Sequence, residues 1–123
     1  MTFTWLGGAG YLLRLGPFRI IGDPVAAASI ELDGSGAVRD APAPPADLSG
    51  LDAVCLTCTR TDHYDPELVG GIEAVPVLTP AGAEVPGGRG VEWFEGITLE
   101  KEGERLTITA VQAQSLADGA DEP

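Results

Sequence analysis

Long apolar runs are missing from this sequence. The longest ones, such as residues 25–28 and 75–78, fall far short of the roughly 20 residues that a membrane-spanning helix needs. The opening residues 1–6 carry no basic stretch of the kind that begins a secretory signal. We therefore expect a soluble, cytoplasmic protein that does not have a membrane as its partner.

Basic residues are also scarce. Seven Lys and Arg stand against 19 Asp and Glu, which gives a formal net charge of -12. Proteins that bind nucleic acid neutralise phosphates with Lys and Arg. The composition therefore excludes a nucleic-acid partner from our expectations.

Cysteine and histidine are nearly absent, with two Cys and one His in 123 residues. Two cysteines do not make the disulfide-rich scaffold of a small secreted protein. Cys55 and Cys58 have the spacing of a CxxC motif. In a strand, however, side chains three residues apart point to opposite faces, which argues against a disulfide or a shared metal ion. We expect Cys55 to be a small buried hydrophobe and Cys58 a thiol at the edge of a pocket.

The remaining composition is that of a folded domain, with 44% hydrophobic and 21% charged residues. A chain of this length is one domain, which we place at residues 1–115. An acidic C-terminal tail should follow at residues 116–123.

Short strands separated by glycine and proline dominate the pattern. Three are expected at residues 2–6, 11–15 and 18–22, and a hairpin is expected around residues 33–36. A strand buried on both faces should cover residues 52–57, because its residues are mostly apolar and prone to form strands. Further strands are expected at residues 75–78, 91–95 and 106–111.

Helix should be scarce. Asp65 has the position of an N-cap, Pro66 that of the first helical residue, and the helix should continue to Val69 or Ile72. Trp5, Trp93 and Phe94 are expected first of all in the core, since large aromatic side chains bury much area. The fold class is α/β, with a largely antiparallel and mixed sheet and one or two short helices.

Two blocks of sequence resemble the metallo-β-lactamase superfamily, most of all its ascorbate-lactonase-like branch. The first block runs through residues 4–12 (TWLGGAGYL) into residues 20–24 (IIGDP), and the second through residues 51–57 (LDAVCLT) into residues 62–65 (DHYD). The resemblance implies one half of a four-layer αββα sandwich. It extends to about Ser115, and the family's second half, which supplies further metal ligands, does not follow here.

The same resemblance implies where metal ligands would lie. The family's second block ends in Thr-His-x-His-x-Asp-His, where this chain reads Thr-Cys-Thr-Arg-Thr-Asp-His over residues 57–63. Asp62 and His63 keep ligand identity, whereas Cys58 and Arg60 replace histidines. Gly8 stands at another histidine position, and Gln114 or Ser115 at a later one. The expected pocket therefore comprises six residues: Gly8, Cys58, Arg60, Asp62, His63 and Gln114.

The family's chemistry depends on Zn²⁺, which lowers the pKa of a bound water to about 7 and so supplies hydroxide. Arg60 opposes such an ion, because a guanidinium has no lone pair to donate and remains cationic. We expect instead a salt bridge from Arg60 to Asp62 in the pocket that holds the metal in the resembling family. No cofactor is expected; zinc, with Asp62 and His63 as its ligands, is the alternative.

Three hypotheses for function follow. The first is a non-catalytic member of the fold that acts as a binding or interaction module, with a small molecule as its ligand. The second is a metal-dependent hydrolase of lactone, ester or phosphoester type, in which Asp62, His63 and Cys58 bind one ion shared across a dimer. The third is a metal-free site in which Cys58 is the nucleophile and His63 the base. Whether the chain is an enzyme stays open at this point, and no residue is assigned a catalytic role.

A half-sandwich also implies a partner. The inner face of the sheet would stay exposed and apolar unless something covered it. The economical expectation is a homodimer with an isologous contact, and a different partner chain is the alternative.

Overall fold

The computed structural model describes residues 1–7, 9–25, 29–32, 37–40, 48–60 and 63–112. Gly8, Asp62 and Gln114, together with the expected tail at residues 116–123, lie outside the described residues. Most of the described chain is strand. The strands are β1 (Thr2–Gly7), β2 (Gly10–Leu15), β3 (Phe18–Gly22), β4 (Ser29–Leu32), β5 (Ala37–Asp40), β6 (Ala53–Cys55), β7 (Val77–Pro80), β8 (Gly88–Val91), β9 (Gly96–Lys101) and β10 (Glu104–Thr109).

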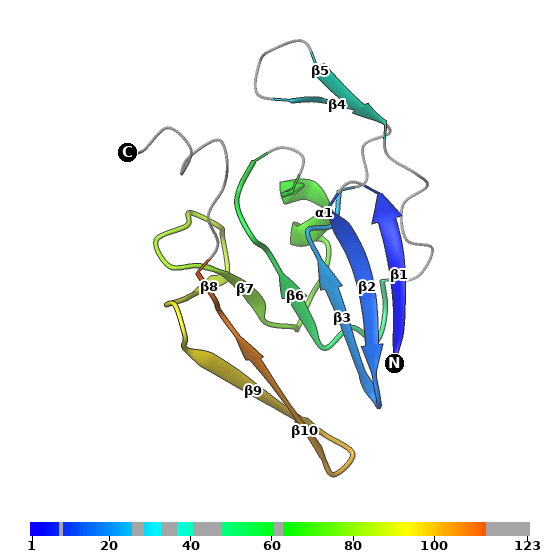
Figure 1. The fold of residues 1–123 in the computed structure, drawn as a ribbon, viewed down its shortest axis with the longest axis vertical. Coiled ribbons are helices and arrows are strands. Elements are labelled where there is room, and N and C mark those ends of the chain that lie inside the picture. The colour runs from blue at the N-terminus through cyan, green and yellow to red at the C-terminus, as the bar shows by residue number, and fades with distance from the viewer. Residues whose placement is uncertain (8, 26–28, 33–36, 41–47, 61–62, 113–123) are drawn as a thin grey trace.

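Six of these strands form one mixed sheet in the order β1-β2-β3-β6-β7-β8 (Figure 1). β1, β2 and β3 are successive antiparallel neighbours, whereas β6 lies parallel to β3, β7 parallel to β6, and β8 parallel to β7. Two separate hairpins, β4–β5 and β9–β10, complete the described strands. The fold is therefore α/β with a mixed sheet and very little helix, as the sequence predicted.

The helix of the described residues, α1 (Pro66–Gly70), begins where the sequence predicted. Asp65 is the N-cap, and its side chain accepts a hydrogen bond from the backbone N–H of Leu68 at 3.1 Å. Pro66 opens the helix with a fixed φ and no N–H to satisfy, and Glu67 lies favourably in the first turn. No helix in the described part of the chain combines the length and apolar character that crossing a bilayer would require.

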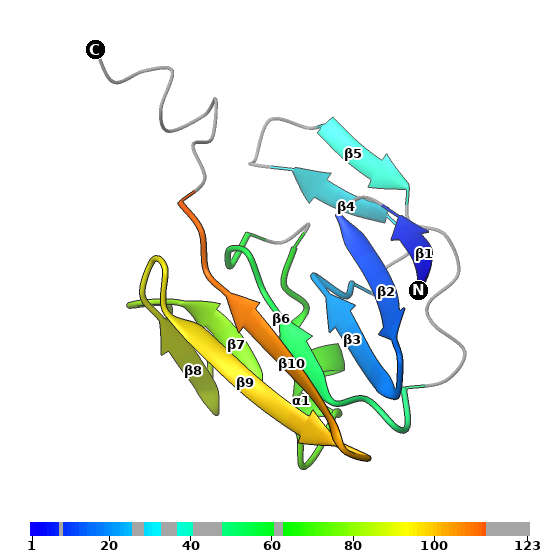
Figure 2. The ribbon, with the colours of Figure 1, turned by 60° about the horizontal axis from the view of Figure 1, so that its bottom comes forward.

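The two faces of the sheet are covered differently. Figure 2 shows α1 behind the sheet and the β9–β10 hairpin in front of it. Val69 of α1 packs into the larger core cluster, whereas Ile97 of β9 belongs to a smaller cluster on the other side. The larger cluster consists of Ile21, Leu51, Val54, Leu56, Val69, Val77 and Val85.

The observed strands agree closely with the predicted ones in the first half of the chain and less closely in the second half. The three N-terminal strands and the buried strand around Val54 lie where they were predicted. The strand predicted at residues 91–95 is wrong, because β8 ends at Val91 and a turn follows in which Phe94 has a φ of 66°. A strand cannot continue through a left-handed residue. The prediction for residues 75–78 is displaced, since β7 covers Val77–Pro80.

The aromatic residues are the clearest correction. Trp5, Trp93 and Phe94 were expected in the core, yet they are 66%, 61% and 72% exposed. Small and branched aliphatic side chains fill the two clusters instead. The covering elements, a five-residue helix and the β9–β10 hairpin, leave Trp5, Trp93 and Phe94 exposed.

Candidate functional site

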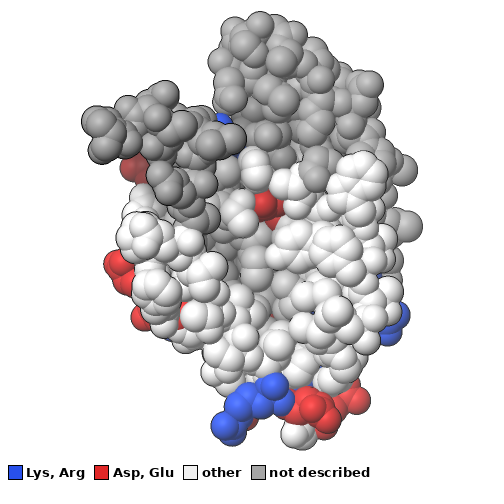
Figure 3. Space-filling view, in the orientation of Figure 1, with Lys and Arg blue, Asp and Glu red and all other residues white. Residues whose placement is uncertain are grey.

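Polar side chains meet where the parallel strands β3 and β6 end. Asp23 follows β3 directly, Thr57 comes two residues after β6, and His63 lies on the loop before α1. The carboxyl ends of parallel strands are where α/β sheets place their ligand sites. In Figure 3 a recessed acidic patch is visible in the middle of an otherwise largely uncharged surface.

Asp23 is the centre of this cluster and is 3% exposed. Its Oδ1 accepts a hydrogen bond from the Thr57 N–H at 2.8 Å, and its Oδ2 accepts one from the Thr57 hydroxyl at 2.6 Å. The Nδ1 of His63 lies 2.9 Å from the same Oδ2. A buried carboxylate is costly unless donors surround it, and these three donors supply that environment. Asp23 thereby joins two segments that are 34 residues apart in the chain.

The backbone of Asp23 is in the left-handed region, with a φ of 42°. This conformation is uncommon for residues other than glycine, and it is followed here by a proline. The Asp23 N–H still finds an acceptor, the carbonyl of Cys55 at 2.9 Å. Backbone strain of this kind persists where the surroundings hold it in place, so the hydrogen bonds of Asp23 fix the direction in which its carboxylate points.

The hydrogen bonds around His63 determine its tautomer. The Thr57 hydroxyl has one hydrogen, which it donates to Asp23, and its oxygen also lies 3.2 Å from His63 Nδ1. Both neighbours of Nδ1 are therefore acceptors, so Nδ1 must carry the hydrogen. In the neutral ring the lone pair is then on Nε2, which is the nitrogen through which His63 can bind a ligand or accept a proton.

Tyr11 on β2 and Cys55 on β6 lie near Asp23, whose negative charge acts on both groups. A Cβ at Gly22 would lie 2.2 Å from the Tyr11 ring, so glycine is needed for the ring to cross β3. Burial raises the pKa of the Cys55 thiol to about 11, and the negative charge of Asp23 adds to this shift. Burial likewise raises the pKa of Tyr11, with further contributions from Cys55 and Asp23. Both groups are therefore neutral at neutral pH.

The residues predicted from the sequence are brought together only in part. His63 joins the cluster, and the carbonyl of Arg60 accepts the N–H groups of His63 and Tyr64, each at 2.9 Å. Arg60 itself is exposed and Cys58 half-buried, and both cysteines are free thiols. Asp62, Gly8 and Gln114 lie outside the described residues, so the salt bridge from Arg60 to Asp62 stays a prediction.

Of the side chains expected to bind a zinc ion, Cys58 and His63 are among the described residues and Asp62 is not. Within the described ranges, no three side chains of His, Cys, Asp or Glu gather closely enough to hold an ion. The oxygens of Asp23 accept three hydrogen bonds from Thr57 and His63, so this carboxylate is directed toward the protein's own donors. Among the described residues of this loop, Cys58 and His63 are of types that can ligate a metal.

The sequence analysis missed Asp23 and Thr57 as parts of the site. Asp23-Pro24 was interpreted as the end of a strand, and Thr57 as the last residue of another. The signal that would have found them is a carboxylate and a hydroxyl each placed directly after an apolar strand. When two such strands are parallel neighbours, their ends meet, but the sequence did not show that β3 and β6 pair.

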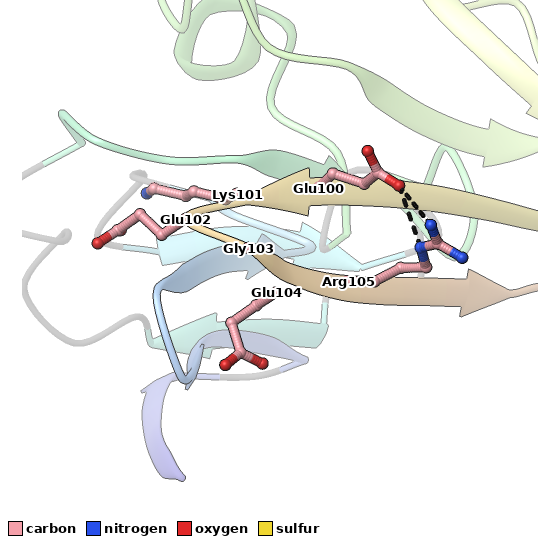
Figure 4. A pocket seen from close by; sticks show the side chains of 6 residues that line it. All are labelled: Glu100, Lys101, Glu102, Gly103, Glu104 and Arg105. Carbon is pink, nitrogen blue, oxygen red and sulfur yellow. Dashed lines mark hydrogen bonds and ion pairs between the residues drawn. The ribbon is translucent and has the colours of Figure 1, made fainter.

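A second hollow lies at the turn between β9 and β10. It is lined by residues 100–105, and Glu100 pairs there with Arg105 at 2.8 Å (Figure 4). The side chains of Glu100, Glu102 and Glu104 point in different directions. The Glu100 and Arg105 side chains are 67% and 72% exposed, so this hollow is a solvated turn and does not form a convergent site.

Comparison with known proteins does not assign this site. A scan against models of protein families gives no match, and a search of curated proteins finds no similar one.

Proposed function

We propose that this chain is one half of a metallo-β-lactamase-like αββα sandwich that has become a non-catalytic binding or interaction module. Support for the half-sandwich comes from the two sequence blocks at residues 4–24 and 51–65 and from a mixed sheet with a short helix on one face. Support for a binding role comes from the polar cluster at the carboxyl ends of β3 and β6.

The observation that carries this proposal is the set of three hydrogen bonds that Asp23 accepts from its own chain. Its two oxygens accept hydrogen bonds from Thr57 N, Thr57 Oγ1 and His63 Nδ1. A carboxylate surrounded by donors of its own chain orients those neighbours. It holds the His63 ring in one tautomer at the carboxyl ends of β3 and β6. The arrangement suits recognition of a small polar molecule.

Arg60 favours the same conclusion. It stands at a position where the resembling family has an imidazole, and a guanidinium donates hydrogen bonds but has no lone pair for a metal. Together with His63 it gives the loop a donor and an acceptor within four residues of chain. A ligand with a hydrogen-bonding polar group is the class that such a loop recognises.

The single histidine makes the proposal testable by NMR. Long-range ¹H–¹⁵N spectra should show one imidazole signal set, with hydrogen on Nδ1, and adding Zn²⁺ at equimolar concentration should leave the Nε2 signal unchanged. The protein should not hydrolyse p-nitrophenyl acetate or bis(p-nitrophenyl) phosphate above background. Stoichiometric zinc in the purified protein, or a Zn²⁺-dependent shift of Nε2, would overturn the proposal.

A metal-dependent hydrolase is the second candidate, and one observation favours it. Histidines that bind metals usually donate their other ring N–H to a carboxylate, which is what His63 does with Asp23. In this case Asp62, His63 and Cys58 bind one ion, completed by a second copy. Hydrolysis that is lost on chelation and again in His63→Ala would support this candidate, whereas activity that survives either treatment would contradict it.

A further inference from the structure

The turn that joins β8 to β9 carries two large aromatic side chains at the surface. Residues 92–96 are all exposed, and Trp93 and Phe94 are 61% and 72% exposed. The residues on either side of this stretch, Val91 and Ile97, are buried in the smaller core cluster. The turn therefore projects into solvent from two buried anchors. We call residues 92–95 the aromatic turn.

Hydrogen bonds give the aromatic turn a fixed shape. The N–H of Glu95 donates to the carbonyl of Glu92 at 3.0 Å, and the N–H of Glu92 donates to the Glu95 carboxylate at 3.1 Å. Ala110, which follows β10, accepts the N–H of Phe94 at 2.6 Å and donates its own N–H to the carbonyl of Glu95 at 3.0 Å. A surface turn held in this way loses little conformational freedom when it binds a partner.

Phe94 occupies a position that suits glycine. A turn that is closed by a hydrogen bond from its fourth residue to its first, with a positive φ at the third residue alone, is of type II, and that third residue is usually Gly. Phe94 is the third residue here and has a φ of 66°, which is costly for a bulky side chain. Burial does not offset this cost, because the side chain is largely exposed. Strained residues of this kind cluster at ligand sites.

The aromatic turn lies at the same edge of the sheet as the polar cluster around Asp23. β3, β6, β7 and β8 are parallel neighbours, so their carboxyl ends share one edge. The register pairs Cys55 with Leu78 and Leu78 with Arg89, which puts the end of β8 two strand positions, or roughly 10 Å, from the end of β6. Sheets of α/β proteins bind ligands along this edge, so position and strain point independently to a binding role.

Charge identifies the kind of partner. Residues 90–99 include two Glu and no Lys or Arg, and the two carboxylates, Glu92 and Glu95, flank the aromatic pair. Figure 3 shows acidic groups on the side of the molecule where Figure 1 draws this turn. A cation is attracted both by carboxylates and by the face of an aromatic ring, and the net charge of -12 attracts cations at longer range. An anionic partner would be repelled, and an apolar one would desolvate the carboxylates without pairing them.

We propose that the aromatic turn binds an arginine side chain of a partner protein. A guanidinium stacks on an aromatic face and donates hydrogen bonds in its own plane to carboxylates. It therefore uses both kinds of group in this turn, the ring of Trp93 and the carboxylates of Glu92 and Glu95. A lysine ammonium is more strongly hydrated and does not stack. The proposal does not depend on what His63 binds.

NMR titration with triarginine, a short peptide that carries the proposed side chain, tests this against trilysine. The chain has two tryptophans, so the two indole N–H signals report separately on Trp93 and Trp5. Triarginine should shift the Trp93 signal and bind several-fold more tightly than trilysine. Trp93→Ala, followed through backbone amide signals, should weaken binding about 2–5-fold, the change that corresponds to an exposed cation–π contact. Trp5→Ala is the matched control, since Trp5 is 66% exposed on β1, and should bind like the wild type.

Two further variants separate binding from folding. Glu95→Gln removes one charge but keeps a side-chain oxygen that can accept the Glu92 N–H, so it should weaken triarginine binding without loss of the fold. Phe94→Gly relieves the positive φ and should raise the urea midpoint of unfolding while weakening triarginine binding. A Phe94 that served only the fold would give the opposite change in the midpoint.

Four outcomes would overturn the proposal. One is a Trp93 signal that millimolar triarginine leaves in place. Another is trilysine that binds as tightly as triarginine, which would show a general attraction of cations to the acidic chain. The third is equal weakening by Trp5→Ala and Trp93→Ala. The fourth is a Phe94→Gly variant that unfolds at a lower urea concentration than the wild type.

Discussion

The two faces of the central sheet differ in how completely the chain covers its own apolar surface. On the face under α1, a cluster of seven buried residues includes Ile21 and Val54, both 0% exposed. On the opposite face, the β9–β10 hairpin buries Leu78, Val91 and Ile97, while Phe3 and Trp5 remain largely exposed. The face under α1 therefore holds the larger core cluster, whereas the opposite face leaves the aromatic side chains of β1 exposed.

The largest expected effect on stability comes from a substitution in the core cluster under α1. Ile21→Ala removes a fully buried side chain from the centre of the larger cluster and should lower the free energy of unfolding by about 2–5 kcal/mol. Trp5→Ala, on the face opposite α1, should change the free energy of unfolding by no more than about 0.5 kcal/mol in dilute protein. Urea unfolding measures both. Equal losses for the two variants would contradict the distinction between the faces.

Removing the carboxylate at the edge of the sheet should have the next largest effect. Asp23→Ala leaves the Thr57 N–H, which lies in a part-buried hydrogen bond, without its acceptor and releases His63. The expected loss is about 1.5–3 kcal/mol, the usual range for hydrogen bonds to charged groups. The imidazole NMR signals of His63 should also lose their preference for the Nδ1–H tautomer. A variant with unchanged stability and unchanged signals would show that Asp23 does not position His63.

Gly22→Ala tests whether the Tyr11 ring lies over Gly22 of β3, on the face opposite α1. The added Cβ would meet the Tyr11 ring at 2.2 Å, and such overpacking costs about 1–3 kcal/mol. The double variant Gly22→Ala with Tyr11→Ala should lose less stability than the two single effects combined, because the clash is gone. Simple additivity of the two substitutions would contradict this contact.

A smaller effect is expected from pH on the Cys55 thiol. The pKa is raised from 9.0 to about 11 in the folded chain, so the fold favours the protonated thiol. Its contribution to stability is complete below pH 9.0 and is lost as the pH rises through about 11. The stability difference between wild type and Cys55→Ala should therefore shrink over this window. A difference independent of pH would contradict the burial of the thiol.

Local patterns allowed the sequence to predict individual elements but not their assembly. The cap formed by Asp65 and Pro66 and the strand at residues 11–15 depend on neighbours in the chain, and both were predicted correctly. The parallel pairing of β3 with β6 depends on residues more than 30 positions apart, and no local pattern encodes it. Asp23 and Thr57 were missed for this reason.

The exposed aromatic residues teach a related lesson. Burial of Trp5 and Trp93 was inferred from side-chain size, but the sheet is covered by elements too small to enclose them. Strand geometry places Phe3 and Trp5 on the face opposite to Thr4 and Leu6, but no local pattern says which face the hairpin covers. His63 was identified because residues 57–63 resemble the Thr-His-x-His-x-Asp-His motif, whereas its contact with Asp23 could be found only from the fold.

The dependence of His63 on Asp23 has a consequence for the kinetics of folding. Asp23 gains its donors only after the segment between β3 and β6 has closed and the parallel pair has formed. Parallel strands joined by a long connection are among the slower contacts to form. The ordered imidazole should therefore arise late during refolding, and the recovery of its NMR signal would report that the chain has completed its long-range pairing.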